Sequence, residues 1–272
     1  MTKRFFTLLF AFAAMVTMAN AQNTINGHEY VDLGLTSGTL WATCNVGATK
    51  PEEYGDYFAW GETKPKSDYS WNTYKWCDGS KETLTKYNDS SYYGKVDNKS
   101  ELDLEGDAAH ANWGNQWRMP NKVQIEELAY KCHWRKESLN GVEGFRVVGP
   151  NENSIFLPAT GHYNESEKLY ETKQAYYWSR FNGREVSYYP VLGVVLHSYS
   201  GDPEDSDWDI FNRSLGITVR AIVDKNAVSD GIDAIKDEMI INNHYYSVDG
   251  KKLSGEPTKP GLYIHNGKKV VK

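Results

Sequence analysis

The residue types that most often carry chemistry are sparse in this 272-residue chain. The three cysteines are Cys44, Cys77 and Cys132, and no grouping of Cys and His has the spacing of a zinc site. A cysteine nucleophile needs a neighbouring base, but no local signature joins a cysteine to a histidine. No Gly-x-Ser-x-Gly motif marks a serine nucleophile either. The sequence therefore favours a protein without enzymatic activity, although an enzyme stays an open alternative.

Two acidic runs have the oxygen chemistry that Ca²⁺ prefers. One places Asp103, Glu105 and Asp107 at alternate positions, and the other lies within residues 204–209. Neither run supplies a complete ligand loop, so a solvated acidic loop is the simpler interpretation of both. We expect no bound metal and no cofactor, with Ca²⁺ as the one ion that the composition leaves open.

A capped amphipathic helix is the clearest structural signal in the chain. Its apolar residues have the i, i+3, i+4, i+7 spacing of one helical face, at Ile125, Leu128, Ala129 and Cys132. Asn121 and Gln124 have the spacing of a capping box at its start. Trp113 and Trp117 lie just upstream, and we expect them to dock this helix on the core.

Short strands account for most of the remaining pattern. Alternating polar and apolar residues predict two strands around a turn at Ser37 and Gly38. Further strands are predicted at 56–61, 144–148, 154–157, 176–179, 191–199 and 217–223. Residues 63–106 are polar and predict a long loop, which aromatic side chains would pin down: Tyr69, Trp71, Tyr74, Trp76, Tyr87, Tyr92 and Tyr93. One main helix, short antiparallel strands and long aromatic loops predict an α+β fold.

The N-terminus has the organisation of a secretory signal peptide, over residues 1–21. Lys3 and Arg4 precede an apolar segment, and small residues end it at Ala19 and Ala21. No later apolar run is long enough to span a membrane. A net charge of −6 argues against nucleic acid as a partner. We expect a secreted or cell-surface protein, with the periplasm as the alternative location.

Export permits disulfide formation, and an odd number of cysteines leaves one thiol over. Cys132 lies on the apolar face of the predicted helix, and Cys44 lies in a strand-like run at 39–46. A helix packed on that strand would bring the two together, so Cys44–Cys132 is the predicted disulfide. Three buried, unbonded thiols are the alternative, because a free cysteine packs as a small hydrophobic side chain.

Five ordered segments carry a family resemblance. They are EYVDLGLTSGTLWATCNVGATKPEEYGDYFAWGET, YKWCDGS, DAAHANWGNQWRMPNKVQIEEL, NSIFLPATG and YYWSR leading to GITVRAIV. This set, from about Tyr30 to Val223, resembles the Fibrobacter succinogenes major paralogous domain family. That family is similar to the C-type lectin-like and formylglycine-generating-enzyme folds, so the resemblance implies a C-type-lectin-like domain. It implies no particular activity, because one fold hosts many functions.

The formylglycine-generating enzymes use a pair of cysteines near the end of their fold. In this chain all three cysteines lie in the first half, and none lies between Trp178 and Arg220. This difference argues against their oxidation chemistry here.

In lectin-like binding modules, the region between the Trp-Ser and Val-Arg segments supplies the recognition face. Rigid aromatic rings give contact area at low entropic cost, and Arg and Asn add directional hydrogen bonds. The predicted ligand-binding residues are Arg180, Asn182, Arg184, Tyr199, Asp207, Trp208, Asn212 and Arg213. Trp208 is the best single candidate, because a large exposed ring is costly without a partner. The competing interpretation, that this ring covers the end of a sheet, stays open, and Trp178 is predicted to belong to the core.

The chain is expected to divide into a main domain (residues 22–223), a linker (224–238) and a short β-rich segment (239–272). The last segment resembles the C-terminal sorting segments of Bacteroidetes proteins that use the type IX secretion route. A small β-appendage that packs on the main domain is the alternative.

Three hypotheses about function follow. The first is an exported, non-catalytic module that binds a glycan or a protein outside the cell. The export machinery would recognise its signal peptide and, in the type IX interpretation, its C-terminal segment. The second is a structural or adhesive surface component. The third is an extracellular enzyme of unknown class.

Overall fold

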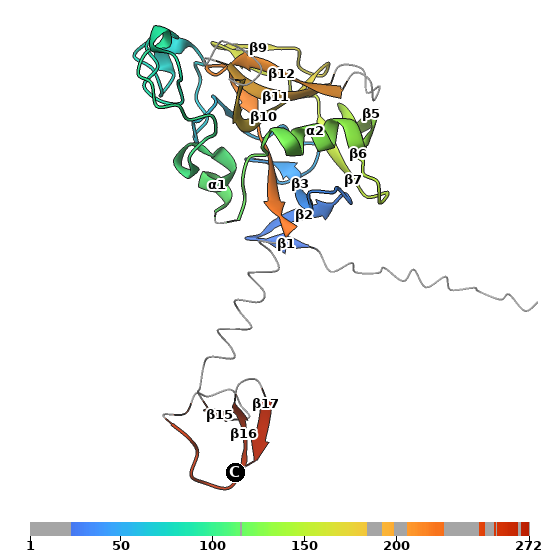
Figure 1. Cartoon of the computed structure of the whole chain (residues 1–272). Coiled ribbons are helices and arrows are strands. Elements are labelled where there is room, and N and C mark those ends of the chain that lie inside the picture. The colour runs from blue at the N-terminus through green and yellow to red at the C-terminus, as the bar shows by residue number, and fades with distance from the viewer. Residues whose placement is uncertain are drawn as a thin grey trace, which may run out of the picture.

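The computed structural model describes most of the chain from residue 23 onward (Figure 1). The described residues are 23–114, 116–183, 192–198, 206–225, 245–247, 253, 255–265 and 268–271. The predicted signal peptide and nearly all of the predicted linker lie outside them. The described part consists mostly of β-sheet with two α-helices, which agrees with the predicted α+β class.

The first sheet joins the beginning of the main domain to its end. It has the order β1 (Thr24–Ile25), β2 (His28–Asp32), β3 (Thr39–Asn45) and β14 (Arg220–Asp224). The predicted hairpin around Gly38 is confirmed, because β2 and β3 pair antiparallel on either side of it. Strand β14 pairs antiparallel with β3, with Ile222 opposite Trp41. The last strand of the domain therefore completes a sheet that the first strands begin.

The second sheet has the order β12 (Ser206–Asn212), β11 (Leu192–Ser198), β10 (Ala175–Asn182), β13 (Ile217–Thr218) and β4 (Tyr57–Phe58). Strands β10, β11 and β12 form an antiparallel meander, and β13 runs parallel to β10 with Thr218 opposite Tyr177. The second acidic run, within residues 204–209, was interpreted as a loop, but its residues from Ser206 onward belong to β12.

Three smaller sheets complete the described strands. One has the order β5 (His133–Leu139), β6 (Val142–Val148) and β7 (Ser154–Pro158), and another pairs β8 (His162–Asn164) with β9 (Glu167–Leu169). Near the C-terminus, β15 (Tyr245–Ser247), β16 (Leu262–His265) and β17 (Lys268–Val271) form a separate antiparallel sheet. The sequence did not predict β5, whose residues are largely polar.

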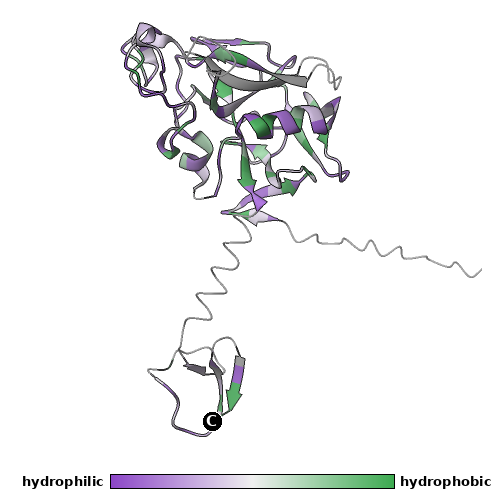
Figure 2. Ribbon diagram, viewed as in Figure 1, coloured by the Kyte–Doolittle hydropathy of each residue, from purple (hydrophilic) through white to green (hydrophobic). Residues whose placement is uncertain are grey.

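The main helix is α2 (Lys122–Lys131), and it follows the predicted pattern closely. Asn121 and Gln124 form the capping box, and the four predicted apolar residues are buried. Figure 2 shows apolar and polar stretches interleaved along α2, as expected for an element with one buried face. A second, unpredicted helix, α1 (Ala108–Trp113), precedes it. Neither of these helices is long and apolar enough to cross a membrane.

Two large clusters of buried side chains share the main domain, and β3 separates them. Leu40 and Ala42 lie in the first cluster, with Trp60, Trp117 and Trp178. Trp41 points the opposite way into the second cluster, with the buried face of α2. Trp178 is fully buried, which confirms its predicted place in the core.

The long segment 63–106 has three short 3₁₀ turns: Trp71–Thr73, Ser91–Tyr93 and Leu104–Gly106. Its aromatic side chains attach it to the main domain, as predicted. The Tyr69 hydroxyl donates to the Tyr57 carbonyl at 2.6 Å, and the Tyr74 hydroxyl donates to the Trp60 carbonyl at 2.8 Å. Tyr92 is the exception, because 73% of its side chain is exposed.

The predicted Cys44–Cys132 disulfide is absent, because all three cysteines are free thiols. The two cysteines lie in different surroundings. Cys132 lies with Trp41 in the second cluster. Cys44 is half-buried and lines a hollow with His28 and Trp113, in the part of β3 where the pairing with β14 shifts register. The strands that α2 mainly contacts are β12, β10 and β11 rather than β3, so the expected packing of the helix on this strand is also wrong.

Arg220 is expected to be the polar group on which folding stability depends most. Its buried guanidinium donates to four acceptors, at distances of 2.8 to 3.0 Å. We expect Arg220→Met to lower the free energy of unfolding by about 3 kcal/mol or more, since it leaves several buried acceptors without a donor. Urea unfolding followed by tryptophan fluorescence measures this. Arg135→Met is the matched control, because 60% of the Arg135 side chain is exposed. Equal effects of the two substitutions would contradict the role given to Arg220.

Candidate functional site

One hollow of the main domain, of about 330 Å³, lies beside the start of α2. We call it the Arg180 cleft. All but one of its lining side chains end in a planar guanidinium, carboxamide or carboxylate group. The lining residues are Gln116, Arg118, Asn121, Gln124, Arg180, Ile222 and Asp224. Such groups make directional hydrogen bonds, so the cleft has the chemistry of a recognition site.

Backbone hydrogen bonds hold the two arginines of the cleft in place. Arg118 exchanges both backbone hydrogen bonds with Ile222 of β14, at 3.0 and 2.9 Å. The Arg180 N–H, on β10, donates to the Pro120 carbonyl at 2.8 Å. The turn that leads into α2 is therefore fixed to β10 and β14, and both guanidiniums start from rigid backbone.

Asp107 anchors the same turn from inside. Its buried carboxylate accepts the Met119 N–H at 2.9 Å and the His110 N–H at 3.0 Å, so it also caps α1. Burial raises the pKa of Asp107, and these N–H groups and the nearby charges of Arg118 and Arg180 partly oppose that rise. The arginines of the cleft thus also stabilise a buried charge behind it.

The amide side chains of the capping box contribute donors to the cleft. The Asn121 side-chain oxygen accepts the Gln124 N–H at 3.0 Å, and the Gln124 oxygen accepts the Asn121 N–H at 2.9 Å. Both oxygens are thus engaged inside the helix terminus. The two amide nitrogens are left as the donors that these residues can offer to a ligand.

Of the eight predicted ligand-binding residues, only Arg180 lines this cleft. Its guanidinium lies 3.3 Å from Glu101 and is 27% exposed. Asn212 is exposed at the end of β12. The backbones of Asp207 and Trp208 pair with His197 and Leu196 of β11. Arg184 and Tyr199 lie outside the described residues.

Two predicted binding residues, Asn182 and Arg213, are instead buried supports. The Asn182 amide donates to the Lys99 carbonyl at 3.0 Å. The Arg213 guanidinium donates to the Tyr87 carbonyl at 2.9 Å and lies 4.5 Å from the centre of the Trp60 ring. Both hold segment 63–106 against the second sheet. Their residue types suit ligand binding equally well, so nothing in the sequence indicated that these two side chains are buried.

The first acidic run is divided among different partners. Asp103 forms ion pairs with Lys86 at 2.7 Å and with Lys99 at 2.8 Å, and Glu105 also pairs with Lys86. Asp107 points inward, as described above. Over the described ranges, no three His, Cys, Asp or Glu residues are grouped closely enough to hold a metal ion.

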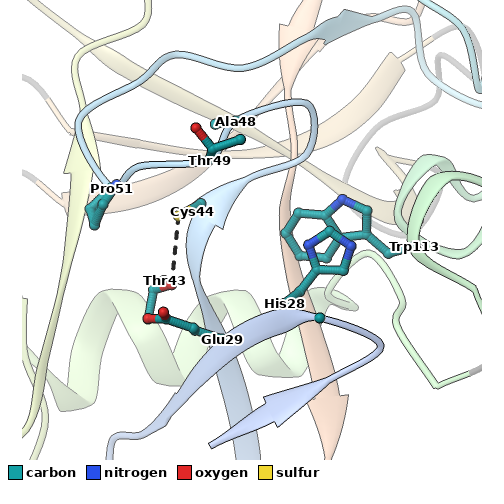
Figure 3. Close-up of a pocket in the computed structure, with 9 residues that line it drawn as sticks. His28, Glu29, Thr43, Cys44, Ala48, Thr49, Pro51 and Trp113 are labelled. Atoms are coloured by element: carbon teal, nitrogen blue, oxygen red, sulfur yellow. Dashed lines mark hydrogen bonds between the residues drawn. The ribbon is translucent and has the colours of Figure 1, made fainter. Parts of the chain in front are cut away.

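A second hollow, of about 280 Å³, lies between the first hairpin and α1 (Figure 3). Its lining residues are Gly27, His28, Glu29, Thr43, Cys44, Ala48, Thr49, Pro51 and Trp113. The sequence did not predict this hollow, because the hairpin residues and Trp113 lie far apart in the chain.

The chemistry of the second hollow does not favour a cysteine nucleophile. The His28 ring stacks on Trp113 with 3.9 Å between ring centres, and Cys44 lies 3.6 Å from the Thr43 hydroxyl. Burial raises the pKa of the Cys44 thiol above its ordinary value of 9.0. The thiol is therefore protonated at neutral pH, whereas nucleophilic attack requires the thiolate.

Comparisons with protein-family models, with curated proteins and with solved structures find no match. The interpretation of the two hollows therefore depends on their own chemistry, and the Arg180 cleft offers the richer set of directional groups.

Cys44 is expected to react slowly with iodoacetamide at neutral pH, with a rate that is still increasing with pH at pH 9.0, where the rate of an ordinary thiol begins to level off. The raised pKa keeps the thiolate fraction small below that value. Mass spectrometry of a Cys77→Ser, Cys132→Ser double variant follows Cys44 alone. The same variant unfolded in urea is the control, since its thiol should regain ordinary reactivity. Alkylation of the folded variant at neutral pH as fast as the unfolded one would contradict the expectation.

Proposed function

We propose that this chain is an exported binding module that recognises a glycan or a protein outside the cell without catalysing a reaction on it. The observation that carries the proposal is the Arg180 cleft. It brings guanidinium, carboxamide and carboxylate groups together on backbone that β10, β14 and the start of α2 hold rigid. Pre-organised polar groups of this kind bind ligands with a smaller entropic cost than mobile ones.

A C-type-lectin-like fold of the major paralogous domain family belongs to the same proposal. Two features of the structure support it. The turn at Arg118, Met119 and Pro120, which belongs to the third segment that carries the resemblance, leads directly into α2. The Trp-Ser pair of β10 also lies beside β13 and the Val-Arg pair that follows it, through the parallel pairing of Tyr177 with Thr218.

The proposed location is the cell surface or the external medium, with the periplasm as the alternative. It depends on the signal peptide predicted over residues 1–21. The three-stranded sheet of β15, β16 and β17 supports a β-rich C-terminal segment. We include a role for this segment in type IX sorting as part of the proposal.

The first test is a glycan array probed with the chain that begins at Gln22, with and without EDTA. We expect reproducible binding that EDTA does not change. We also expect Arg180→Ala to reduce the signal strongly, because it removes one of the two guanidiniums of the cleft. Arg135→Ala is the control, since this arginine lies on β5 away from the lining residues. Trp208→Ala tests the predicted late face separately.

Absence of binding to every glycan would contradict the glycan form of the proposal. Binding that Trp208→Ala removes and Arg180→Ala leaves intact would instead place the recognition face on β12. Loss of binding in EDTA would show that a divalent cation takes part.

A further inference from the structure

We propose that the second hollow, between the first hairpin and α1, binds an amino sugar whose protonated amine lies against Glu29 and whose neighbouring hydroxyls meet His28 and Thr43. We call it the His28 hollow. This inference goes beyond the proposed function, because it assigns a second site on the chain and does not depend on the Arg180 cleft. Four properties of the hollow carry it: its polar groups without partners, its rigid wall, its excess of acceptors and its charge.

The His28 hollow contains polar side chains that the described part of the chain leaves without partners. The Glu29 carboxylate makes no hydrogen bond or ion pair with any described residue. The two ring nitrogens of His28 also have no hydrogen-bond partner among those residues. Both side chains are half-buried. Because a polar group that is partly withdrawn from water gains by pairing, these groups favour a polar ligand.

The wall of the hollow that carries His28 is rigid. The His28 ring stacks on Trp113 with 3.9 Å between ring centres and 10° between ring planes (Figure 3). Trp113 in turn packs edge-on against Trp117, at 5.0 Å. The Asn26 amide donates to the Trp113 carbonyl, and the Trp117 indole N–H donates to the Ile25 carbonyl, both at 3.1 Å. The imidazole is therefore positioned before a ligand arrives, which lowers the entropic cost of binding.

The hollow offers more hydrogen-bond acceptors than donors. Burial lowers the pKa of His28, so its neutral ring has one donor and one acceptor at neutral pH. The ionised Glu29 side chain only accepts. The Thr49 hydroxyl donates to Glu53 at 3.0 Å, and the N–H groups of Thr49 and Lys50 donate to the same carboxylate. These bonds consume the donors of the loop at Thr49, so a ligand that donates fits best. An ammonium group supplies three donors and no acceptor.

The charges around the hollow also favour a cation. Three carboxylates and two basic groups line or adjoin it, which leaves one net negative charge: Glu29, Glu52 and Glu53 against Lys50 and Arg220. The buried Arg220 guanidinium already donates to four acceptors within the domain. The chain as a whole carries a net charge of −6, which attracts cations at long range.

The groups beyond Glu29 distinguish an amino sugar from a simple ammonium. An ammonium on a slender chain, such as a lysine side chain, would meet Glu29 but leave the His28 donor without an acceptor. Sugar hydroxyls both donate and accept. They can therefore satisfy His28 and also the Thr43 hydroxyl, whose contact with the Cys44 thiol at 3.6 Å is a weak hydrogen bond. The volume of about 280 Å³ lies just below the usual range of small-molecule sites, which suits one sugar unit.

The test is isothermal titration of the chain from Gln22 with a disaccharide of two glucosamine units, just below neutral pH so that the amines are protonated. The probes for comparison are the N-acetylated disaccharide, the same disaccharide with hydroxyls in place of the amines, and butylamine. We expect the glucosamine disaccharide to bind about tenfold or more tightly than either other disaccharide, since charged hydrogen bonds are the stronger ones. Butylamine should bind more weakly than the glucosamine disaccharide, because it leaves His28 and Thr43 without partners.

Three variants locate the effect. Glu29→Gln should remove most of the preference for the amine, because it deletes the charge and keeps the size of the side chain. His28→Phe should weaken all three disaccharides, because it keeps a ring on Trp113 and removes both ring nitrogens. Glu82→Gln is the matched control and should change no affinity, since it deletes a negative charge at a side chain that is 45% exposed in segment 63–106. Circular dichroism of each variant shows whether it is folded.

The outcomes separate this inference from the proposed function. Equal affinity for the three disaccharides would overturn the inference, and butylamine binding as tightly as the glucosamine disaccharide would point to a simple ammonium ligand instead. A preference for the amine that Glu29→Gln leaves intact, or that Arg180→Ala removes, would place the amine elsewhere and also overturn it. If the folded chain bound none of these probes while the array showed binding that Arg180→Ala reduces, only the inference would fail. If the glucosamine disaccharide bound in the hollow and Arg180→Ala left every array signal unchanged, the role given to the Arg180 cleft would fail and the inference would stand.

Discussion

The buried guanidinium of Arg220 is the constraint on which the rest of the main domain depends. From β14 it donates to the carbonyls of Ala42 and Thr43 on β3, to the Asn45 side chain, and to the Phe156 carbonyl on β7. A buried charge is tolerated only when hydrogen bonds replace its hydration. These bonds fix β14 relative to two other sheet elements at once. The two buried clusters on either side of β3 are therefore held in one relative position. The turn at Arg118 is held in place with them, because its backbone is hydrogen-bonded to Ile222 of β14.

A second buried charge links this framework to the candidate site. Asp107 caps α1 and accepts the Met119 N–H, so it sets the path of the chain between the two helices. Its carboxylate is stabilised partly by Arg118 and Arg180, which also line the cleft. An anionic ligand would therefore share these guanidiniums with an internal carboxylate. This coupling limits how strongly the cleft attracts anions, and it is consistent with recognition that relies on directional hydrogen bonds as well as on charge.

Local patterns were predictable from the sequence, and long-range placement was not. The helix at Lys122–Lys131 follows from its apolar spacing and capping box, both of which act within a few residues. Cys44 was paired wrongly with Cys132, because the pattern of a strand does not show which other elements pack against it. Asn182 and Arg213 look like surface recognition residues by type, and only the packing of segment 63–106 shows that they are buried. Helix α1 has six residues, too few for a periodic signal.

The candidate site changes from the late loop face to the Arg180 cleft because the described residues bring polar groups together on well-anchored backbone there. Recognition requires polar groups whose positions are set before the ligand arrives. Arg180 meets this condition, because its backbone is hydrogen-bonded to Pro120 on one side and to Leu102 on the other. Asn121 and Gln124, which form the capping box at the start of α2, also supply donors to the cleft. A motif that sequence analysis assigns to helix capping thus also determines the chemistry of the site, since it consumes the two amide oxygens and leaves the two amide nitrogens.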